Sequence, residues 1–335
     1  MEGGLPQPRQ KLKVFITVDT EVWPSHPEWR TNRLHADIEK HLYGATPRGE
    51  LGVRYQLRIL AGAGLKAVFL IEPLFAIAAG LDPLRQLVGE VLEQGHEVGL
   101  HTHAEWVGYL GDQSPIPSRR VQHMKDLGFD DQLRLIETGL DLLRRAGAPN
   151  VESHRAGNYT ANLDTLRALA RAGVRIDTSY NFFYEYTRLG LAPHQEPLQT
   201  PGWFEGTAEY PVSQFIDRPG SYRHVQLAAV SNWEFEHTLG QAWRQGRSSY
   251  VIVSHSFELL KQRAGVTQPD PHWAVKRRFE RLCAFLGANR DRFETALFRG
   301  LPAPAPGPCL PAQPLKSSWI RTGFRMVEQV LGDRL

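Results

Sequence analysis

The sequence predicts an α/β fold, organised as a closed or nearly closed barrel of parallel strands surrounded by helices. Short apolar runs alternate with longer helical patterns along most of the 335 residues, and strands that alternate with helices pair in parallel through right-handed crossovers. Seven or eight such units follow one another, which favours a barrel over an open, doubly wound sheet. No glycine-rich phosphate loop follows the first strand, and this disfavours the nucleotide-binding form of the doubly wound alternative.

The expected strands are short apolar runs rich in β-branched and aromatic residues. In order they are residues 13–18, 66–71, 97–101, 151–154, 174–178, 209–212, 225–230 and 250–254. The expected helices show an amphipathic period, and several begin at a proline or end at a glycine, as at Pro83, Gly95, Gly147 and Gly173. They span residues 50–63, 83–93, 130–145, 163–171, 234–244 and 272–286.

Two long irregular stretches, residues 22–48 and 181–208, follow strands at their carboxyl ends, where barrel enzymes place substrate loops. Both are rich in aromatic residues, among them Trp23, Trp29, Phe182, Phe183, Tyr184, Tyr186 and Trp203. Aromatic faces beside a cleft suit sugar rings, and ordinary loop packing explains these residues equally well.

Composition bounds the class of protein. Hydrophobic residues make up 41% of the chain, enough for a sizeable core, and we expect one large domain over residues 1–300. The formal net charge of +3 is too small to indicate a nucleic-acid partner. With only Cys283 and Cys309, no disulfide framework is expected. No stretch resembles a signal peptide or a membrane span, so we expect a soluble, cytoplasmic protein, whose oligomeric state the sequence leaves open.

The end of the chain has a separate pattern. Residues 301–314 contain six prolines and are expected to form an extended linker. Residues 315–335 then predict an amphipathic helix, with one apolar face formed by Trp319, Ile320, Phe324, Val327, Val330 and Leu331. That face either docks back onto the barrel or contacts a partner or a membrane surface, a role that Arg321 and Arg325 would favour.

The strongest local signal for chemistry is the segment TVDTE at the end of the first strand. Asp19 and Glu21 are two residues apart, so in an extended backbone they point to the same side. Two carboxylates that leave a buried strand together are costly unless they meet a cation or a dedicated network. One can bind a metal while the other serves as a base.

A second signal, EVGLHTHAEW, ends the third strand. His101 and His103 share one face by the same period of two, with Glu105 one step further. Imidazole pairs at this spacing are common metal ligands. The histidine pair alone is weak evidence, because a chain with 13 histidines can contain such a pair by chance. The acidic pair and the histidine pair both end apolar strands, however, and together they predict a metal site.

Three further segments end strands. SHRAGNY places Arg155 after the fourth strand, where an arginine can orient a carboxylate through paired hydrogen bonds. IDTSYN places Asp177 and Ser179 at the end of the next, and YVIVSHSFEL delivers His255 from the last. Each of these residues alone would suit a structural role, but all of them would lie with the first two segments at the carboxyl ends of the barrel strands.

These five segments, in this order, resemble the polysaccharide deacetylase superfamily of carbohydrate esterases, over roughly residues 12–290. The individual motifs are short, and their order and strand-end placement carry the resemblance. It implies a distorted (β/α) barrel, often of seven strands. It also implies an enzyme that removes acetyl groups from a carbohydrate, a glycan or a sugar precursor, with a divalent metal such as zinc.

The resemblance assigns roles to the first two segments. Asp19 takes the position of the family's general base. The neighbouring position, where the family has a metal-binding aspartate, holds Thr20, so Glu21 is the expected substitute. His101 takes the position of the first metal-binding histidine. The family's second ligand lies four positions later, where this chain has Glu105, and whether His103 or Glu105 binds the metal stays open.

The remaining segments complete the implied mechanism. Arg155 takes the place of the arginine that positions the base, although RAGNY departs from the family's Arg-x-Pro-Tyr-Gly and puts the oxyanion-binding backbone amide in question. His255 takes the place of the general acid, and Asp177 is expected to orient it or tune its pKa. A metal would polarise the acetyl carbonyl, Asp19 would accept a proton from the attacking water, and His255 would protonate the leaving group.

Two other functions stay open. A metal amidohydrolase also carries His-x-His at a strand end, usually the first, where this chain has its acidic doublet. A non-catalytic glycan-binding relative would explain why both metal motifs depart from the family pattern, and such a protein would lack stoichiometric metal. A covalent route is disfavoured, because Cys283 lies on a predicted helix and the sequence has no nucleophile elbow.

Overall fold

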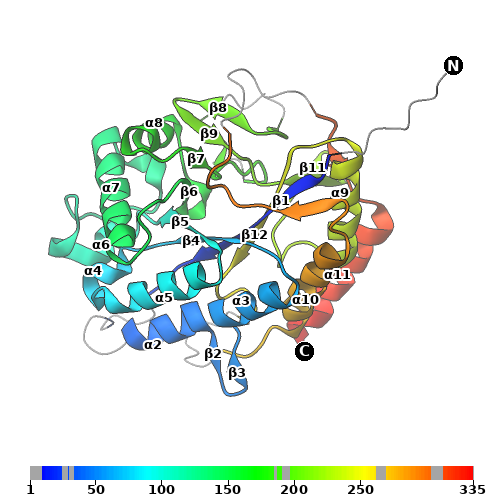
Figure 1. The fold of residues 1–335 in the computed structure, drawn as a ribbon, viewed down its shortest axis with the longest axis horizontal. Coiled ribbons are helices and arrows are strands. Elements are labelled where there is room, and N and C mark those ends of the chain that lie inside the picture. The colour runs from blue at the N-terminus through cyan, green and yellow to red at the C-terminus, as the bar shows by residue number, and fades with distance from the viewer. Residues whose placement is uncertain are drawn as a thin grey trace.

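The computed structural model describes residues 10–24, 29, 34–184, 187–190, 197–261, 269–302 and 312–334. At its centre, seven parallel strands among these residues form one curved sheet in the order β12-β1-β4-β5-β6-β7-β9 (Figure 1). They are β1 (Leu12–Thr20), β4 (Val68–Ile71), β5 (Glu97–Thr102), β6 (Ser153–Ala156), β7 (Ile176–Asp177), β9 (Thr207–Glu209) and β12 (Ser249–His255). The predicted distorted (β/α) barrel is confirmed.

The strand order explains how the barrel winds. From β1 to β9 each parallel strand lies beside the one before it in the chain, while β12 returns to the other side of β1. Two short strands extend this sheet: β8 (Gly202–Phe204) pairs antiparallel with β9, and β13 (Phe293–Thr295) pairs with the start of β1. The carboxyl ends of all parallel strands therefore open on the same side of the molecule.

β1 shows how the barrel interior is organised. Leu12, Val14, Ile16 and Val18 belong to the main hydrophobic core, whereas Phe15 belongs to a smaller cluster with residues of β4, β7, β9 and β12. Since side chains alternate along a strand, Thr17 and Asp19 share the side of Phe15. The interior thus changes from apolar at the amino end of the strand to polar at its carboxyl end.

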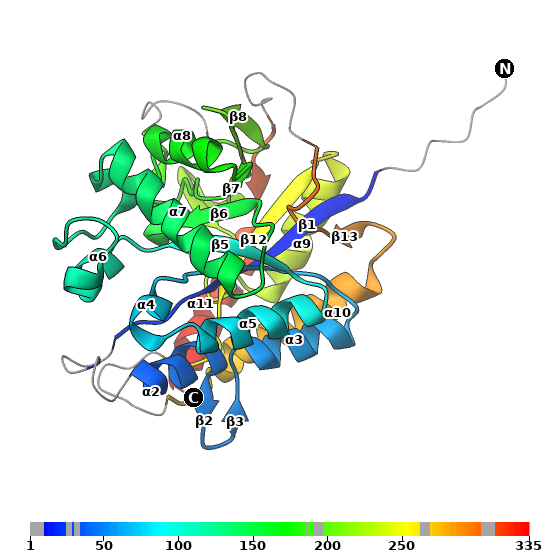
Figure 2. The ribbon, with the colours of Figure 1, turned by 60° about the vertical axis from the view of Figure 1, so that its left-hand side comes forward.

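Six helices surround the sheet close to their predicted positions (Figures 1 and 2). They are α3 (Val53–Gly62), α5 (Asp82–Glu93), α7 (Phe129–Arg145), α8 (Leu163–Ala172), α9 (Asn232–Arg244) and α10 (Trp273–Ala288). α8 and α9 begin with reciprocal capping bonds, Asn162 with Thr165 and Ser231 with Glu234. α8 ends at Gly173, whose φ of 84° lies in the left-handed region that favours glycine. None of the described helices is long and apolar enough to cross a membrane.

The structure differs from two strand predictions. The predicted strand 225–230 is wrong: only Gln226 forms an isolated bridge, to Val253 of β12, and a turn begins at residue 227. Residues 210–213 lie after β9, where they bridge the gap between β7 and β12. The Val212 amide donates to the Tyr180 carbonyl on one side, and the Ser213 amide donates to Val251 of β12 on the other.

The loops contain short elements that periodicity does not reveal. Residues 34–50 form α2 (Leu34–Ile38), a π-helical turn (Glu39–Tyr43) and the hairpin of β2 (Ala45–Thr46) and β3 (Gly49–Glu50). The others are α4 (Phe75–Ala79), α6 (Trp106–Leu110), the antiparallel pair β10 (Gln214–Arg218) and β11 (Ser221–His224), and β14 (Leu315–Lys316) beside β10. Tyr186 and Cys309 lie outside the described residues, as does most of the predicted linker.

The C-terminal helix, α11 (Trp319–Arg334), lies against α9, α10 and β10 (Figures 1 and 2). Its contacts are made by its polar side, where Thr322 and Arg325 are buried. Trp319, Ile320, Phe324, Val327 and Val330, which the sequence places on one apolar face, are exposed. The helix therefore docks, but with its polar side inward.

Candidate active site

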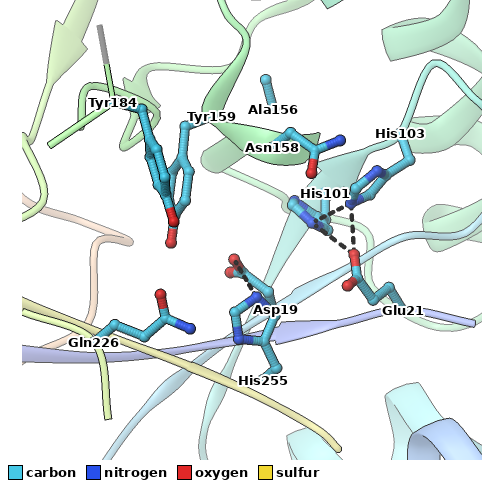
Figure 3. A pocket seen from close by; sticks show the side chains of 10 residues that line it. All are labelled: Asp19, Glu21, His101, His103, Ala156, Asn158, Tyr159, Tyr184, Gln226 and His255. Atoms are coloured by element: carbon cyan, nitrogen blue, oxygen red, sulfur yellow. Dashed lines mark hydrogen bonds and ion pairs between the residues drawn. The ribbon is translucent and has the colours of Figure 1, made fainter. Parts of the chain in front are cut away.

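A cavity of about 240 Å³ opens at the carboxyl ends of the strands (Figure 3). The residues that line it are Asp19, Glu21, His101, His103, Ala156, Asn158, Tyr159, Tyr184, Gln226 and His255. Five of the eight site residues predicted from the sequence are in this lining. Arg155, Glu105 and Asp177 are not: Arg155 lies behind Asp19 and Glu105 behind His103, whereas Asp177 bonds to His154 and Ser179, which do not line the cavity.

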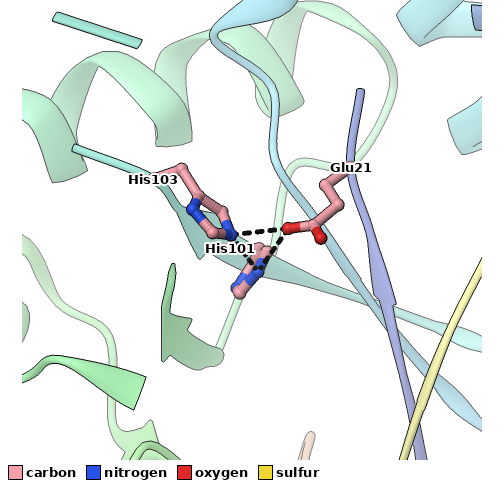
Figure 4. A group of neighbouring side chains, drawn as sticks. All are labelled: Glu21, His101 and His103. Atoms are coloured by element: carbon pink, nitrogen blue, oxygen red, sulfur yellow. Dashed lines mark hydrogen bonds and ion pairs between the residues drawn. The ribbon is translucent and has the colours of Figure 1, made fainter. Parts of the chain in front are cut away.

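Glu21, His101 and His103 present three candidate metal ligands that lie within 4.8 Å of one another (Figure 4). Glu21 directly follows β1, His101 lies on β5, and His103 directly follows β5. The two imidazole Nε2 atoms are 3.1 Å apart, and Glu21 Oε2 lies 3.2 Å from that of His101 and 2.5 Å from that of His103. A tetrahedral ion with bonds of about 2.0–2.1 Å keeps its ligand atoms roughly 3.3 Å apart. The two separations that involve His101 are close to this value, whereas Glu21 and His103 are in direct hydrogen-bond contact and would have to move apart to bind one ion together.

The outer nitrogen of each histidine is held by a hydrogen bond. His101 Nδ1 donates to the Arg155 carbonyl at 2.8 Å, and His103 Nδ1 donates to Glu105 Oε2 at 3.1 Å. Glu105 also accepts a bond from Asn158. Such bonds fix the tautomer in which Nε2 is free to bind a metal. Glu105 thus lies behind His103, on the side away from the triad.

Gly157 leaves room for the His103 ring. A Cβ atom on Gly157 would lie 2.4 Å from His103 Nδ1 and within 2.6 Å of two other ring atoms. Any residue with a Cβ atom at this position would therefore collide with the ring. The glycine of RAGNY and the position of His103 are linked, because the second requires the first.

The charges around the triad favour a cation. Burial disfavours charge on His103, but the carboxylates of Glu21 and Glu105 outweigh it and raise its pKa to about 10. Burial also opposes the charge on Glu21, yet His103 and His101 hold the pKa of that carboxyl well below its usual range. A buried site that stabilises a proton between two carboxylates has the charge to hold a metal ion in its place.

Asp19 is fixed by a buried arginine. Arg155 Nη1 donates to Asp19 Oδ1 at 2.6 Å and to Thr17 Oγ1 at 2.9 Å, and its Nε donates to the Thr178 carbonyl. Both charged side chains are buried, which is tolerable only for a pair with its hydrogen bonds made. The pair leaves Asp19 Oδ2 directed toward His255.

His255 is held by Glu258, which sequence reasoning missed. Glu258 Oε2 accepts a bond from the His255 backbone amide at 2.8 Å and lies 3.3 Å from His255 Nδ1. Its other oxygen accepts from Gln226 and from the Ala228 amide. Burial lowers the pKa of His255, but Glu258 outweighs it and raises that pKa to about 9. The sequence signal for this contact was that Glu258 lies three positions after His255.

Asp177 is engaged elsewhere. It accepts from His154 Nδ1 at 2.7 Å and from Ser179 Oγ at 2.9 Å, and it lies beside the buried Glu209. Burial opposes its charge, but the bond from His154 holds its pKa below the usual range. The His154 ring in turn reaches Thr102 at 2.8 Å. Among the described residues, the carboxylate beside His255 Nδ1 is therefore that of Glu258, while Asp177 links β7 to β6 through His154.

No protein-family model and no curated protein sequence matches this chain. Solved structures do. A protein named a putative polysaccharide deacetylase, from Mycobacterium smegmatis, superposes with a TM-score of 0.52 at 16% identity, covering 87% of this chain and 88% of the other. A family 4 carbohydrate esterase from Streptomyces lividans, solved with acetate, has a TM-score of 0.42 at 14% identity and covers 89% and 100%. The barrel of this chain is thus the fold of the Mycobacterium smegmatis protein.

Proposed function

We propose that this chain is a divergent member of the polysaccharide deacetylase superfamily and hydrolyses an acetyl group from a glycan or sugar precursor with a divalent metal. The observation that supports the proposal most directly is the set of side chains that line one cavity. Glu21, His101 and His103 offer metal-binding atoms on one side, and the pair of Asp19 and His255 faces them (Figure 3). The fold shared with the Mycobacterium smegmatis protein supports it.

Glu21, His101 and His103 would hold the metal, for which zinc is our first candidate because two imidazoles and a carboxylate suit it. A bound ion would supply Lewis acidity toward an acetyl carbonyl and toward a water molecule. Asp19 acts as the general base: its Oδ2 accepts a proton from the attacking water while Arg155 holds Oδ1 at 2.6 Å. Arg155 fixes the direction of the Asp19 carboxylate.

His255 acts as the general acid. Its Nδ1 is directed to Glu258, so Nε2 faces the cavity, 3.9 Å from Asp19 Oδ2. With its pKa raised to about 9, His255 carries a proton at neutral pH and gives it to the departing amine or alcohol. We assign the orienting role to Glu258 and not to Asp177.

The turn after β6 supplies the third part of the site. Asn158 and Tyr159 both adopt left-handed backbone conformations, with φ of 52° and 58°. Such residues cost on the order of 1–3 kcal/mol each and are concentrated at functional sites. Because both line the cavity, we propose that the backbone amides of this turn stabilise the developing oxyanion.

The cavity also limits the substrate. A volume of about 240 Å³ suits one sugar residue, and the rings of Tyr159 and Tyr184 stack 6.2 Å apart to form one wall. Aromatic walls bind the apolar faces of sugar rings. A polymer would then present one residue at a time to the metal, with the rest of its chain outside.

The test is release of acetate. The purified protein, reconstituted with one equivalent of zinc, is incubated with N-acetylated chito-oligosaccharides and with O-acetylated xylan, and free acetate is measured. We expect acetate from at least one of them and none from the metal-free protein. Stoichiometric metal without acetate release from either would contradict the proposal. Hydrolysis of a cyclic amide instead would favour an amidohydrolase, and glycan binding without bound metal would favour the non-catalytic alternative.

A further inference from the structure

The outer side of α11 carries most of the large hydrophobic side chains that are exposed among the described residues. Nine large hydrophobic side chains are exposed in the described part of the chain, and seven of them lie together here. We call these seven the α11 face: Trp233, Trp319, Ile320, Phe324, Met326, Val327 and Val330. Trp233, on α9, joins the patch through a ring contact with Phe324 at 6.1 Å. Surfaces of this kind mark interaction sites.

Buried ion pairs fix the orientation of the helix. Arg325 lies 2.8 Å from Asp217 and 3.2 Å from Glu234, and all three side chains are almost completely buried. Arg278 of α10 reaches Glu328 at 2.6 Å. Rotating α11 so that its apolar side faced inward would break these ion pairs. Each charged group would then lie without its partner, either in apolar surroundings or in solvent. The helix therefore cannot turn its apolar side inward without breaking a buried charge network.

The charge pattern argues against a membrane as the partner. Helices that lie on a bilayer combine an apolar side with lysines and arginines beside it. Here Arg325 is buried in ion pairs with Asp217 and Glu234. Arg321 is half-buried, with its guanidinium carbon 5.0 Å from the centre of the Trp233 ring. The exposed positions described between residues 319 and 330 carry no charged residue. An uncharged face rich in tryptophan, phenylalanine and methionine fits the centre of a protein interface.

The size and spacing of the face fit a second copy of the chain. Its seven side chains expose between 43% and 73% of their surface, which amounts to roughly 700 Å² if a large side chain presents up to about 150–250 Å². A stable interface buries about 800 Å² from each partner. Ile320, Phe324 and Val327 are successively four and three residues apart, the spacing of a seam between two packed helices. Gly323, exposed among them, would allow close approach.

We propose that this protein forms a homodimer in which the α11 faces of two copies pack against each other about a two-fold axis. Such an interface uses the same patch on both subunits, as cyclic dimers do. It removes from water seven of the nine large hydrophobic side chains that are exposed among the described residues. The inference does not depend on the proposed catalytic function, because the α11 face contributes no residue to the cavity.

The experiment is sedimentation velocity on the full chain at concentrations from about 1 to 100 μM. We expect the wild-type protein to sediment with twice the 37.8 kDa mass of one chain. Ile320→Glu and Val327→Glu, each placing a charge at the centre of the seam, should sediment as monomers, with circular dichroism spectra and melting temperatures like those of wild type. Gln86→Glu, which adds the same charge on the exposed side of α5, should remain a dimer.

Two results would overturn the proposal. One is a dimer that persists in both glutamate variants. The other is a wild-type monomer throughout this range. If that monomer sediments with phosphatidylglycerol–phosphatidylcholine vesicles while Ile320→Glu does not, the face is assigned to a bilayer.

Discussion

Asp19 and His255 are register partners on the adjacent parallel strands β1 and β12, and Asp19 Oδ2 lies 3.9 Å from His255 Nε2. They are 236 positions apart in the sequence, yet the pairing of the two strands places them side by side at one end of the barrel. The other atom of each side chain is already bonded, Asp19 Oδ1 to Arg155 and His255 Nδ1 to Glu258. The two free atoms therefore face the same space, which suits a base and an acid acting on one substrate.

The first prediction concerns the base. Asp19→Asn keeps the size of the side chain and removes its ability to accept a proton. We expect kcat for acetate release to fall by on the order of 10²–10⁴-fold, while metal content measured by mass spectrometry stays at the wild-type level. Asp112→Asn, an exposed change away from the cavity, is the control. Activity of Asp19→Asn within a few-fold of wild type would remove Asp19 from the mechanism.

The second prediction concerns Glu258 and pH. Because His255 must be protonated to act as an acid, activity is lost as pH rises through its pKa, which Glu258 raises to about 9. In Glu258→Gln that support is lost, so we expect the alkaline limb of the kcat profile to move down toward the ordinary histidine pKa of about 6.5. Glu236→Gln, an exposed change on α9, should leave the limb in place. An unshifted limb in Glu258→Gln would show that another group sets it.

The same interaction contributes to stability with a definite sign. A histidine whose pKa is raised by folding stabilises the native state fully below its unfolded pKa of about 6.5, and the contribution disappears as pH rises through about 9. The difference in unfolding free energy between wild type and Glu258→Gln, measured with urea, should therefore shrink between pH 6 and pH 10. A difference that grows over this range would contradict the assigned direction of the shift.

The third prediction separates His103 from Glu105. His103 presents Nε2 to Glu21 and His101, so His103→Ala should reduce stoichiometric metal binding to a trace. Glu105 contacts the outer nitrogen of His103 and Asn158 but not the triad atoms, so Glu105→Gln should weaken metal affinity by about 10–100-fold without abolishing it. Competition with a chelator of known zinc affinity measures both. The reverse ranking of the two variants would make Glu105 the ligand.

Much of the candidate site could be predicted because it follows from strand position. Asp19, His101, Arg155 and His255 all lie at or next to the carboxyl ends of neighbouring parallel strands, and a parallel sheet brings such ends together whatever the loops do. The period of two also predicted that His101 and His103 share a side. It failed for Glu105, because β5 ends at Thr102 and the chain turns, with the Trp106 amide donating to the His103 carbonyl.

What could not be predicted depends on tertiary contacts. Glu258 lies in a turn, and only the fold of that turn directs its carboxylate back to His255. Asp177 shares the strand-end pattern of the candidate catalytic residues, but it bonds instead to His154 on the neighbouring strand β6. Amphipathicity correctly predicts the helix α11, yet it gives the wrong inward side. Periodicity ranks the faces of a helix by hydrophobicity alone, whereas here buried arginine–carboxylate pairs determine which side of α11 faces the barrel.

The last prediction tests those pairs. Arg325 neutralises Asp217 and Glu234, two carboxylates that are almost fully buried. Removing one partner of a buried charge network leaves the others uncompensated, and this typically costs about 3–5 kcal/mol. Arg223 still reaches Asp217 at 2.8 Å, so we expect the lower end of that range for Arg325→Met, measured by urea unfolding at neutral pH. Ile320→Ser, on the exposed side of the same helix, should change the unfolding free energy by less than about 0.5 kcal/mol in dilute, monomeric protein. If Ile320→Ser were the more destabilising of the two, the apolar side of α11 would have to be the buried one.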